Sequence, residues 1–472
     1  MIDTQAIRNK ILDLAMRGQL TEQLPEDGTA EELFQKIQAE KQALIKAGKI
    51  KKDKLLPEII SDDVPFEIPG NWKWIRFAEI CSIINGDRGK NYPAKSTLKH
   101  EGIPFISALN LNGIGVTKDE NLLCLDEHQY ALLGNGKLQK DDIVICIRGS
   151  LGKHGRYPFE QGAIASSLVI SRLFYPNRVL GDFEMAWLDS PVFPTEIQKY
   201  NNGTAQPNLA ANNLEKFLFP LPPLAAQQRI VDKIDQAFSI LDTIDELQTQ
   251  YADNLTTLKA KLIDAAIQGK LTEQLPEDGT AEELYQQIQT EKQALIKAGK
   301  IKKEKPLSEI REEEIPFDIP TNWKWVRLAS ICNGIFAGGD KPQDFVKVKD
   351  DAHQIPVVAN GVSNDGVMGY TADATAPSNT LTVAGRGTIG FPCYRNYEYC
   401  PVVRLIVIMQ SKDIEPKYLY YVFRSLPADS VGSSIPQLTV PMVRPKLIPL
   451  PPLAEQRRIV ARLEEILPMF ED

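Results

Sequence analysis

An internal duplication constrains the fold of this chain more than any other feature. Residues 19–52 match residues 270–303 at 30 of 34 positions, with a constant offset of 251 residues. A second match has an offset of 229 and joins FPLPPLAAQQRIVDKI, at 219–234, to IPLPPLAEQRRIVARL, at 448–463. A repeat of this kind indicates that one structural unit occurs twice. We therefore predict two copies of a shared frame.

The segments enclosed by the frame are not repeated. Residues 82–218 and 333–447 differ in length and share little beyond a few turns. Short apolar runs and helical patterns alternate in both, so we predict two small α+β domains. The predicted strands are 103–107, 143–147 and 168–174 in the first domain, and 355–358, 380–384 and 402–409 in the second. The predicted helices include 183–188 and 418–425.

A long helix is predicted over residues 226–267, directly after the first variable segment. Its apolar residues recur at alternating spacings of four and three, which is the heptad pattern of helices that pack against other helices. The seam comprises Ile230, Ile234, Ala237, Leu241, Ile244, Tyr251, Leu255, Leu258, Leu262 and Ala265, with Gln248 as its one polar member. An amphipathic helix packed on its own domain is the alternative.

Both ends of the chain correspond to halves of this helix. The two offsets align the N-terminus with its second half and the C-terminus with its first half, which together lack about eight residues of a full copy. The seam residues of the ends include Ile7, Ile11, Ile459 and Leu463. We predict that the termini meet and pack antiparallel against the central helix, with an approximate two-fold axis.

Each frame also contains a second predicted helix. It begins at the capping box Thr29-Ala-Glu-Glu32 and at Thr280-Ala-Glu-Glu283, and Gly48 and Gly299 are placed to end it. The stretches that follow are KAGKIKKDK and KAGKIKKEK, which we interpret as solvated linkers, with phosphate contact as the alternative.

These patterns divide the chain into five segments. They are the N-terminal half of the split frame with its capped helix (1–64), the first variable domain (65–222), the central long helix with the repeated capped helix (223–315), the second variable domain (316–451) and the C-terminal half of the split helix (452–472).

Composition narrows the class of protein. Of the 472 residues, 43% are hydrophobic and 25% charged, and no apolar run is long enough to cross a bilayer. The N-terminus resembles no signal peptide, so we expect a cytoplasmic protein without a membrane partner. The six cysteines include no CxxC pair and only four histidines are present, so we expect neither zinc nor disulfides.

The net charge of −8 argues against a polycation that coats nucleic acid. The variable segments are nearly neutral, with 14 basic and 14 acidic residues in 82–218, and 11 and 10 in 333–447. Within residues 143–181, however, the sequence has five basic residues and a single acidic one, Glu160. They are Arg148, Lys153, Arg156, Arg172 and Arg178. We predict a basic patch there.

This patch centres on a glycine-rich turn, Arg148-Gly-Ser-Leu-Gly-Lys-His-Gly-Arg156, whose counterpart is Arg386-Gly-Thr-Ile-Gly390. Glycines allow close approach of a ligand, and the side chains supply donors to phosphates or base edges. A tight hairpin turn with solvated cations has the same pattern, and the sequence leaves both open. A polar loop around Asn201 to Asn208 could read bases, although turn and cap roles suit such residues equally.

Each variable domain contains candidate DNA-contacting residues. In the first they are Arg88, Lys90, Arg148, Ser150, Lys153, His154, Arg156, Asn202, Thr204 and Gln206. In the second they are Lys341, Asn360, Arg386, Thr388, Arg395, Ser434 and Gln437. The repeated tryptophans Trp72, Trp74, Trp323 and Trp325 belong to the shared frame, so we interpret them as packing residues rather than base-stacking ones.

No catalytic motif emerges. A nucleotide-binding GxxxxGK[ST] loop does not occur, and the Pro-Pro pairs lie in LPPL, without the amide and aromatic residues of an amino-methyltransferase motif. Neither a metal-ligand cluster nor a set of nucleophile, base and orienting residue is recognisable. We expect a chain that is not an enzyme.

Taken together, the features resemble the specificity subunit of type I restriction-modification systems. The resemblance covers the whole chain and rests on PLPPLAxQxRIV, the long helix, the glycine turn and the split copy at the termini. It implies that each variable domain reads one half of an asymmetric double-stranded DNA site, while the helices set the spacing and dock two modification (methyltransferase) subunits. It also implies a restriction subunit, and S-adenosylmethionine, ATP and Mg bound by these partners, with no cofactor in this chain.

Two rival functions remain at this point. One is a coiled-coil scaffold whose variable domains bind proteins, which a salt-dependent DNA shift would exclude. The other is a self-sufficient methyltransferase, which the missing motif disfavours. The role of the repeated GTAEEL helix is open, and a wider docking surface for the modification subunits is one interpretation.

Overall fold

The structure is a computed structural model that describes residues 1–52, 56–113, 115–116, 122–200, 208–303, 305–425 and 437–470. The chain forms two compact units, Met1–Thr249 and Gln250–Asp472. Each unit combines helices with small sheets, so the predicted α+β class is confirmed. No helix in the described part of the chain is long and apolar enough to span a membrane.

The first unit begins with two frame helices and continues into the first variable domain. Its helices are α1 (Thr4–Met16), α2 (Ala30–Lys46), α3 (Glu127–Leu132), α4 (Arg178–Asp189), α5 (Val192–Tyr200), α6 (Ala211–Leu214) and the start of α7 (Leu224–Ile267). Its strands are β1 (Lys73–Arg76), β2 (Cys81–Asn85), β3 (Ile103–Ile106), β4 (Leu123–Leu125), β5 (Lys137–Gln139), β6 (Ile143–Cys146), β7 (His154–Arg156), β8 (Gln161–Ile164), β9 (Leu168–Leu173) and β10 (Leu218–Leu221). They pair in the orders β1-β10, β2-β9-β6-β7 and β4-β3-β8-β5.

The second unit follows the same plan. Its helices are the end of α7, α8 (Ala281–Lys297), α9 (Pro416–Ser425), α10 (Val440–Val443) and α11 (Leu453–Ile466). Its strands are β11 (Lys324–Arg327), β12 (Cys332–Ala337), β13 (Ile355–Val358), β14 (Val367–Thr371), β15 (Thr380–Val383), β16 (Pro392–Arg395), β17 (Cys400–Pro401), β18 (Ile406–Gln410) and β19 (Leu447–Leu450). They pair as β11-β19, β12-β18-β15-β16 and β14-β13-β17.

The first and last strands of each variable domain pair with each other. β1 runs antiparallel to β10, from Lys73 opposite Leu221 to Arg76 opposite Leu218, and β11 and β19 pair in the same way. The two WKW segments and the two LPPL segments therefore bring the entry and exit of each domain to one place. A domain enclosed in this way can differ from its counterpart without altering the frame.

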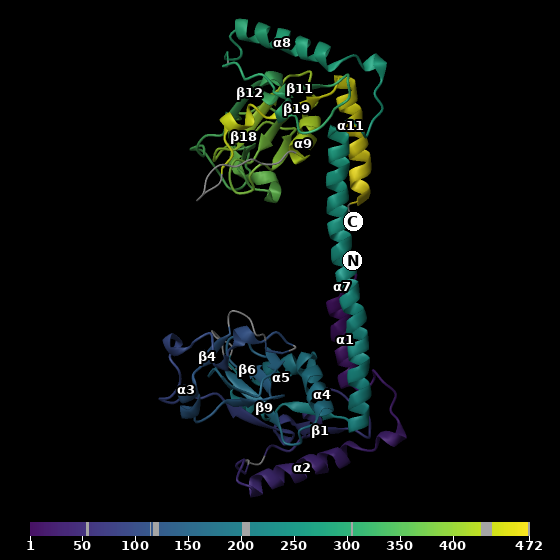
Figure 1. Ribbon diagram of the computed structural model, residues 1–472, viewed down its shortest axis with the longest axis vertical. Helices are drawn as coiled ribbons and strands as arrows, with labels where there is room; N and C mark the ends of the chain where they lie inside the picture. The colour runs from purple at the N-terminus through teal and green to yellow at the C-terminus, as the bar shows by residue number, and fades with distance from the viewer. Residues whose placement is uncertain are drawn as a thin grey trace. The chain divides into compact units, whose positions relative to one another are not determined.

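The N-terminal helix packs antiparallel against the first part of α7, as predicted (Figure 1). The Ile2 amide donates to Gln248 Oε1 at 2.5 Å, Thr4 bonds Asp245, and Arg8 donates to Asp242 at 2.8 Å. Residue numbers rise along α1 as they fall along α7, which defines the antiparallel direction. Gln248, the one polar member of the predicted seam, thus binds the backbone of the N-terminus.

In the second unit, α11 packs against the last part of α7 (Figure 1). Ile459 and Leu463 are fully buried in one core with Ile263, Ala266 and Ile267. Each end of the chain therefore packs on its expected portion of the long helix. That the two termini meet stays a prediction.

The heptad seam is only partly right. Ile230, Ile234 and Leu241 are buried, but Leu258 is 45% exposed and Ile7 is 40% exposed. In the second half of α7 and in α1 the buried positions lie one residue later than predicted, for example Ile263 rather than Leu262 and Leu12 rather than Ile11. These helices pack on the domain cores as well as on each other, so the alternative of an amphipathic helix on its own domain is also partly correct.

The capped helices form as predicted. Thr29 and Thr280 are the N-caps of α2 and α8, and Gly48 follows α2 with a left-handed φ of 67°. Trp72 and Trp323 are buried and donate through Nε1 to Gln23 and Gln274, each at 3.0 Å. Their packing role is therefore confirmed.

One predicted strand is wrong in its bounds. The segment 402–409 was expected to be one strand, but β18 begins at Ile406, because Val403 and Arg404 adopt φ values of 53° and 61°. A left-handed residue breaks the extended backbone, and sequence patterns give no sign of it at a valine. The other predicted strands and helices appear within a few residues of their expected positions.

Candidate nucleic-acid interface

In the first domain, the glycine turn lies at one edge of the sheet β2-β9-β6-β7. The last residues of β2 and β6 flank the beginning of β9, since Asn85 pairs with Val169 and Cys146 with Leu168. The turn that follows β6 is closed by a hydrogen bond from the Gly152 amide to the Cys146 carbonyl at 2.9 Å, and Gly149 and Gly152 have left-handed φ angles. Here the glycines are needed for their backbone conformation.

This turn meets the end of the polar loop and the segment after β2. Arg148 forms a β-bridge with Asn208, and the Leu209 amide donates to Ile147 O at 2.9 Å. Arg88 donates to the Ser166 carbonyl at 3.2 Å. Arg88, Lys90, Arg148, Ser150 and Asn208 are exposed. We call the surface formed by these five residues the glycine-turn edge of the first domain; the predicted Asn202, Thr204 and Gln206 lie outside the described residues.

The second domain has an equivalent edge. Ala337 at the end of β12 and Val383 at the end of β15 both pair with Ile406 at the start of β18. The turn after β15 carries Arg386. The Leu438 amide donates to Gly385 O at 2.9 Å, which corresponds to the bond from Leu209 to Ile147 O in the first domain. The Arg386 guanidinium lies 3.5 Å from Gln437 Oε1. Two separate sequence signals, the turn and the polar loop, thus meet in both domains.

Other predicted residues complete this edge of the second domain. Lys341 lies over the Phe345 ring, 4.2 Å from its centroid, and both Lys341 and Thr388 are exposed. Ser434 lies outside the described residues. The glycine-turn edge of the second domain comprises Lys341, Arg386, Thr388, Arg404 and Gln437. Arg404 was not predicted, because only the left-handed turn before β18 brings it to this edge.

Asn360 supports the edge from behind. Its amide accepts a hydrogen bond from Gly385 N at 2.8 Å and donates to Val403 O at 2.7 Å. Its backbone carbonyl accepts from Thr388 Oγ1 at 3.0 Å. Asn360 was predicted to contact DNA, but its amide is already bonded to two turns, so it positions them instead.

Four predicted DNA-contacting side chains are instead bonded to groups within the protein. His154 is buried and its Nε2 lies 3.1 Å from Asp189, while Arg156 donates to Asp182 at 2.6 Å. Arg395 is 2% exposed and donates to Thr382 at 3.1 Å. Lys153 also donates inward, to Ala108 O at 2.8 Å. Contact with DNA would require these side chains to leave their partners, so the structure does not support that role.

The predicted basic patch is largely neutralised. Arg172 bonds Asp142 at 2.6 Å, Arg178 bonds Asp182 at 3.0 Å, and Asp141 also lies near Arg178, at 3.4 Å. Burial raises the pKa of Asp142, and Arg172 opposes that shift. All three carboxylates lie just outside the window 143–181 in which the charges were counted. Of the five basic residues, Arg148 is the one left exposed at the glycine turn.

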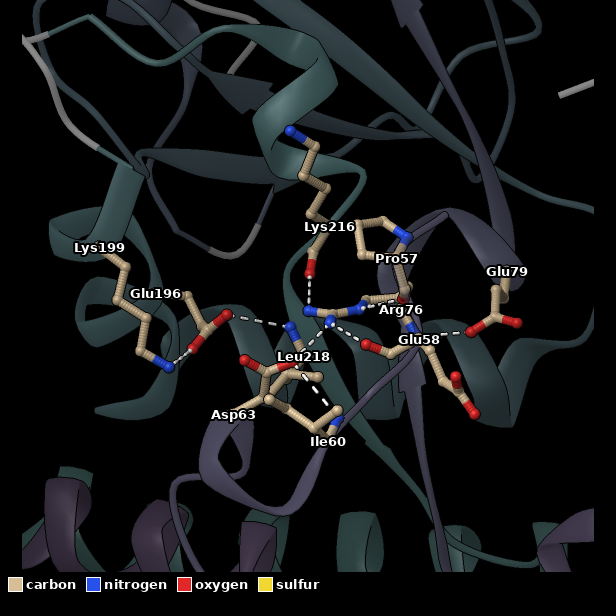
Figure 2. A network of polar contacts seen from close by, with 10 residues as sticks. All are labelled: Pro57, Glu58, Ile60, Asp63, Arg76, Glu79, Glu196, Lys199, Lys216 and Leu218. Atoms are coloured by element: carbon tan, nitrogen blue, oxygen red, sulfur yellow. Dashed lines mark hydrogen bonds and ion pairs between the residues drawn. The ribbon is translucent and has the colours of Figure 1, made fainter. Parts of the chain in front are cut away.

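The sequence analysis also missed a network of polar contacts where the first domain begins and ends (Figure 2). The buried Arg76 donates to Lys216 O at 2.9 Å, to Glu58 O at 3.2 Å and to Asp63 at 2.8 Å. Nearby, Glu196 accepts from the Leu218 amide at 3.0 Å. Arg327 forms the corresponding network in the second unit. The recurrence of this arginine after each WKW segment was the available signal.

The repeated PLPPLAxQxR segment has a structural explanation. Gln227 and Gln456 are fully buried and donate to the carbonyls of Pro222 and Pro451, each at 2.9 Å. Arg229 donates to both oxygens of Asp27, at 2.6 Å for Oδ2. This pair clamps α7 to the turn before α2, and Arg458 binds Asp278 equivalently.

Removing the clamp is expected to destabilise the first unit. Asp27 is 1% exposed, and the hydrogen bond from Arg229 lowers the pKa of its carboxyl. Arg229→Ala would remove the ion-pair partner of this carboxylate, at a cost of about 1–3 kcal/mol. Because the Asp27 pKa is lowered in the folded state, the wild-type contribution exists above the ordinary carboxyl pKa and is lost as pH falls below about 4.

Urea denaturation of the full chain at pH 7 and at acid pH measures this effect. Arg462→Ala is the control, because its pair with Glu465 is half exposed and is worth about 0–1 kcal/mol. Equal midpoints for Arg229→Ala and the control at pH 7 would contradict the proposed clamp.

Among the described residues, no group of three or more His, Cys, Asp or Glu side chains could hold a metal ion. The glycine-turn edges instead offer exposed guanidinium, ammonium, hydroxyl and amide groups. These are donors suited to phosphates and to the edges of base pairs.

Comparison with known proteins identifies the family of this chain. The sequence model of the family described as "Type I restriction modification DNA specificity domain" matches residues 69–251 and 320–468. The chain is 28% identical to the specificity subunit of the type I restriction enzyme EcoAI of Escherichia coli, over 98% of this chain and 88% of that protein. It is 29% identical to the EcoEI specificity subunit of Escherichia coli, over 70% of this chain and 62% of that protein.

A solved structure shares the fold. A chain from work on complex assembly and conformational transition of the type I R-M system superimposes with a TM-score of 0.59 and 19% identity, over 86% of this chain and 92% of that one. Since the family matches cover more than half of the sequence, this chain belongs to the type I restriction-modification DNA specificity family. Its role is non-catalytic DNA recognition, as the sequence predicts.

Proposed function

We propose that each variable domain reads one half of a bipartite double-stranded DNA site through its glycine-turn edge. One observation carries this proposal. Arg148 and Arg386 occupy equivalent turns in two otherwise unlike domains, and each is exposed beside a residue that ends a polar loop. An arginine presented in this way can donate to both acceptors of a guanine or to a phosphate. The pairing of exposed arginine and amide suits base edges better than a protein surface.

The two edges present different groups, so the target is asymmetric. The first domain has Arg88 and Ser150, whereas the second has Lys341, Thr388 and Arg404. Donor patterns that differ in this way favour different base pairs. Identical readers would instead imply a palindromic site.

The helical frame is proposed to dock the partner subunits. Exposed residues of α2, such as Glu31, Gln35 and Lys46, recur unchanged in α8. A surface repeated in this way suits two copies of one partner, which we take to be the modification subunits that bind S-adenosylmethionine. Restriction subunits that bind ATP and Mg complete the complex. We place this assembly in the cytoplasm.

Arg386→Ala is expected to weaken binding to the second half-site. Loss of one bidentate contact to a base costs about 1–3 kcal/mol, which is roughly 5- to 150-fold in affinity. Methylation mapping in cells that also express the modification subunit identifies the site, and filter binding of the complex to that duplex measures affinity against salt. A base contact gives relaxed specificity at one position, whereas a phosphate contact gives a uniform loss and a salt slope smaller by about one.

Arg311→Ala is the matched control, since Arg311 is an exposed frame arginine of the same unit. Unchanged affinity and specificity for Arg386→Ala would contradict the proposed edge. The scaffold alternative predicts a further outcome, namely that the purified complex shifts no DNA at any salt concentration.

A further inference from the structure

The turn that precedes β18 is unusual in its backbone. Val403 and Arg404 have φ values of 53° and 61°. The left-handed region is disfavoured for residues with a side chain, and most of all for a β-branched residue such as valine. Strain of this kind persists where the surrounding structure enforces it, and it concentrates at functional sites. The position therefore calls for a functional explanation.

Neighbouring backbone groups hold this turn in place. The amides of Val403 and Arg404 donate to Gly339 O at 3.0 Å and Gly338 O at 3.2 Å. The Leu405 amide donates to Val402 O at 3.1 Å, and Asn360 donates to Val403 O at 2.7 Å. The conformation is thus fixed from three sides and is not a loose surface loop.

The strained backbone places two unlike side chains in solvent. Val403 is 48% exposed, and Arg404 is exposed with no hydrogen bond or ion pair to its guanidinium from the described part of the chain. Both belong to the segment that adjoins the glycine turn, because a Cβ on Gly385 would lie 3.0 Å from Arg404 O. An apolar group and a cation are therefore exposed on the segment next to the turn that carries Arg386.

The first domain has no left-handed turn at the equivalent position before β9. Pairing of β9 with β2, and of β18 with β12, makes Val169 equivalent to Ile406 and so aligns Ser166 and Ser167 with Val403 and Arg404. Neither Ser166 nor Ser167 has a positive φ. A general requirement of the fold would appear in both domains, so the difference points to the target of the second domain.

We propose that Val403 and Arg404 are specificity-determining residues of the second domain. Arg404 donates to a base edge, and Val403 packs against an adjacent apolar edge such as the methyl group of thymine. The inference rests on the proposed function and goes beyond it, since it assigns base discrimination to a turn that has no counterpart in the other reader.

Val403→Gly separates recognition from folding. Glycine adopts a left-handed φ without strain, so this variant should unfold at the same temperature as the wild type or higher. Its affinity for the mapped duplex should fall about 3- to 10-fold, with relaxed preference at one A·T position of the second half-site. For Arg404→Ala, the affinity should fall roughly 5- to 150-fold and the base preference at a neighbouring position should relax, as expected for one lost base contact.

Asn379→Gly is the matched control. Asn379 is also left-handed, with φ 57°, and it lies at the opposite end of β15 from the glycine turn. This variant should keep the complete site unchanged. Methylation mapping and filter binding with the assembled complex provide both readouts.

The outcomes separate the two proposals. An unchanged second half-site in Val403→Gly and Arg404→Ala, while Arg386→Ala alters it, would overturn this inference and leave the proposed function intact. A uniform affinity loss for Arg404→Ala without relaxed specificity would also overturn it, since that result marks a phosphate contact. If Arg386→Ala has no effect either, the proposed function fails first.

Discussion

Replacement of residues 82–218 by the corresponding segment of another family member is expected to change one half of the recognised DNA site completely and to leave the other half as it was. The structural reason is the pairing of β1 with β10, which closes the first domain upon itself. All contacts of the first glycine-turn edge lie within the exchanged segment, and those of the second edge lie in the other unit. A mismatch at even one base pair costs about 1–3 kcal/mol of binding free energy, so a chimera that reads a new half-site should no longer bind the original one.

Methylation mapping of the chimera tests this expectation, provided that the frame contacts survive. Trp72 packs against Phe183 across the junction, with ring centroids 6.4 Å apart, so the donor segment should carry an aromatic residue at this position. Exchange of 333–447 is the reciprocal control and should alter only the other half-site. If a folded chimera that still binds its partner subunits recognises neither original half-site, the model of two independent readers is contradicted.

A change in the length of α7 should alter the gap between the half-sites. An insertion of seven residues after Thr249 leaves both packed segments of α7 intact and preserves the heptad phase. It lengthens the helix by about 10 Å, which corresponds to roughly three base pairs. Three base pairs also rotate the second half-site by about a third of a turn around the duplex. We therefore expect the original site to be lost and the widened one to be bound weakly.

An insertion of 21 residues should restore recognition. It adds about 32 Å, close to the 34–36 Å of one duplex turn, so both half-sites face the readers again. The expected site has the same half-sites and a gap wider by about nine or ten base pairs. Exchange of exposed residues in the same helix, with its length kept, is the control. If the original gap is still methylated after either insertion, α7 does not set the spacing.

How much of this protein can be predicted from its sequence depends on the range of the interaction involved. The duplicated frame, the long helix, the capped helices and the two enclosed α+β domains follow from repeat and periodicity, which are properties of neighbouring residues. The position of the glycine turns at Arg148 and Arg386 follows in the same way. So does the family, whose signature segments are continuous in sequence.

Tertiary structure decided which of the candidate side chains are free. Arg156 and Arg172 are paired with carboxylates 26 and 30 positions away in the sequence, and Arg395 is buried. Arg178 is paired with Asp182, one helical turn further along α4 and just outside the window of the charge count. Ion pairing and burial depend on residues distant in sequence, so a count of local charges overestimates the basic surface. The exposure of Arg404 likewise depends on backbone torsions fixed by Gly338, Gly339 and Asn360. Sequence periodicity thus determined the frame, while long-range packing decided the reading surface, because only packing sets which donors remain unpaired.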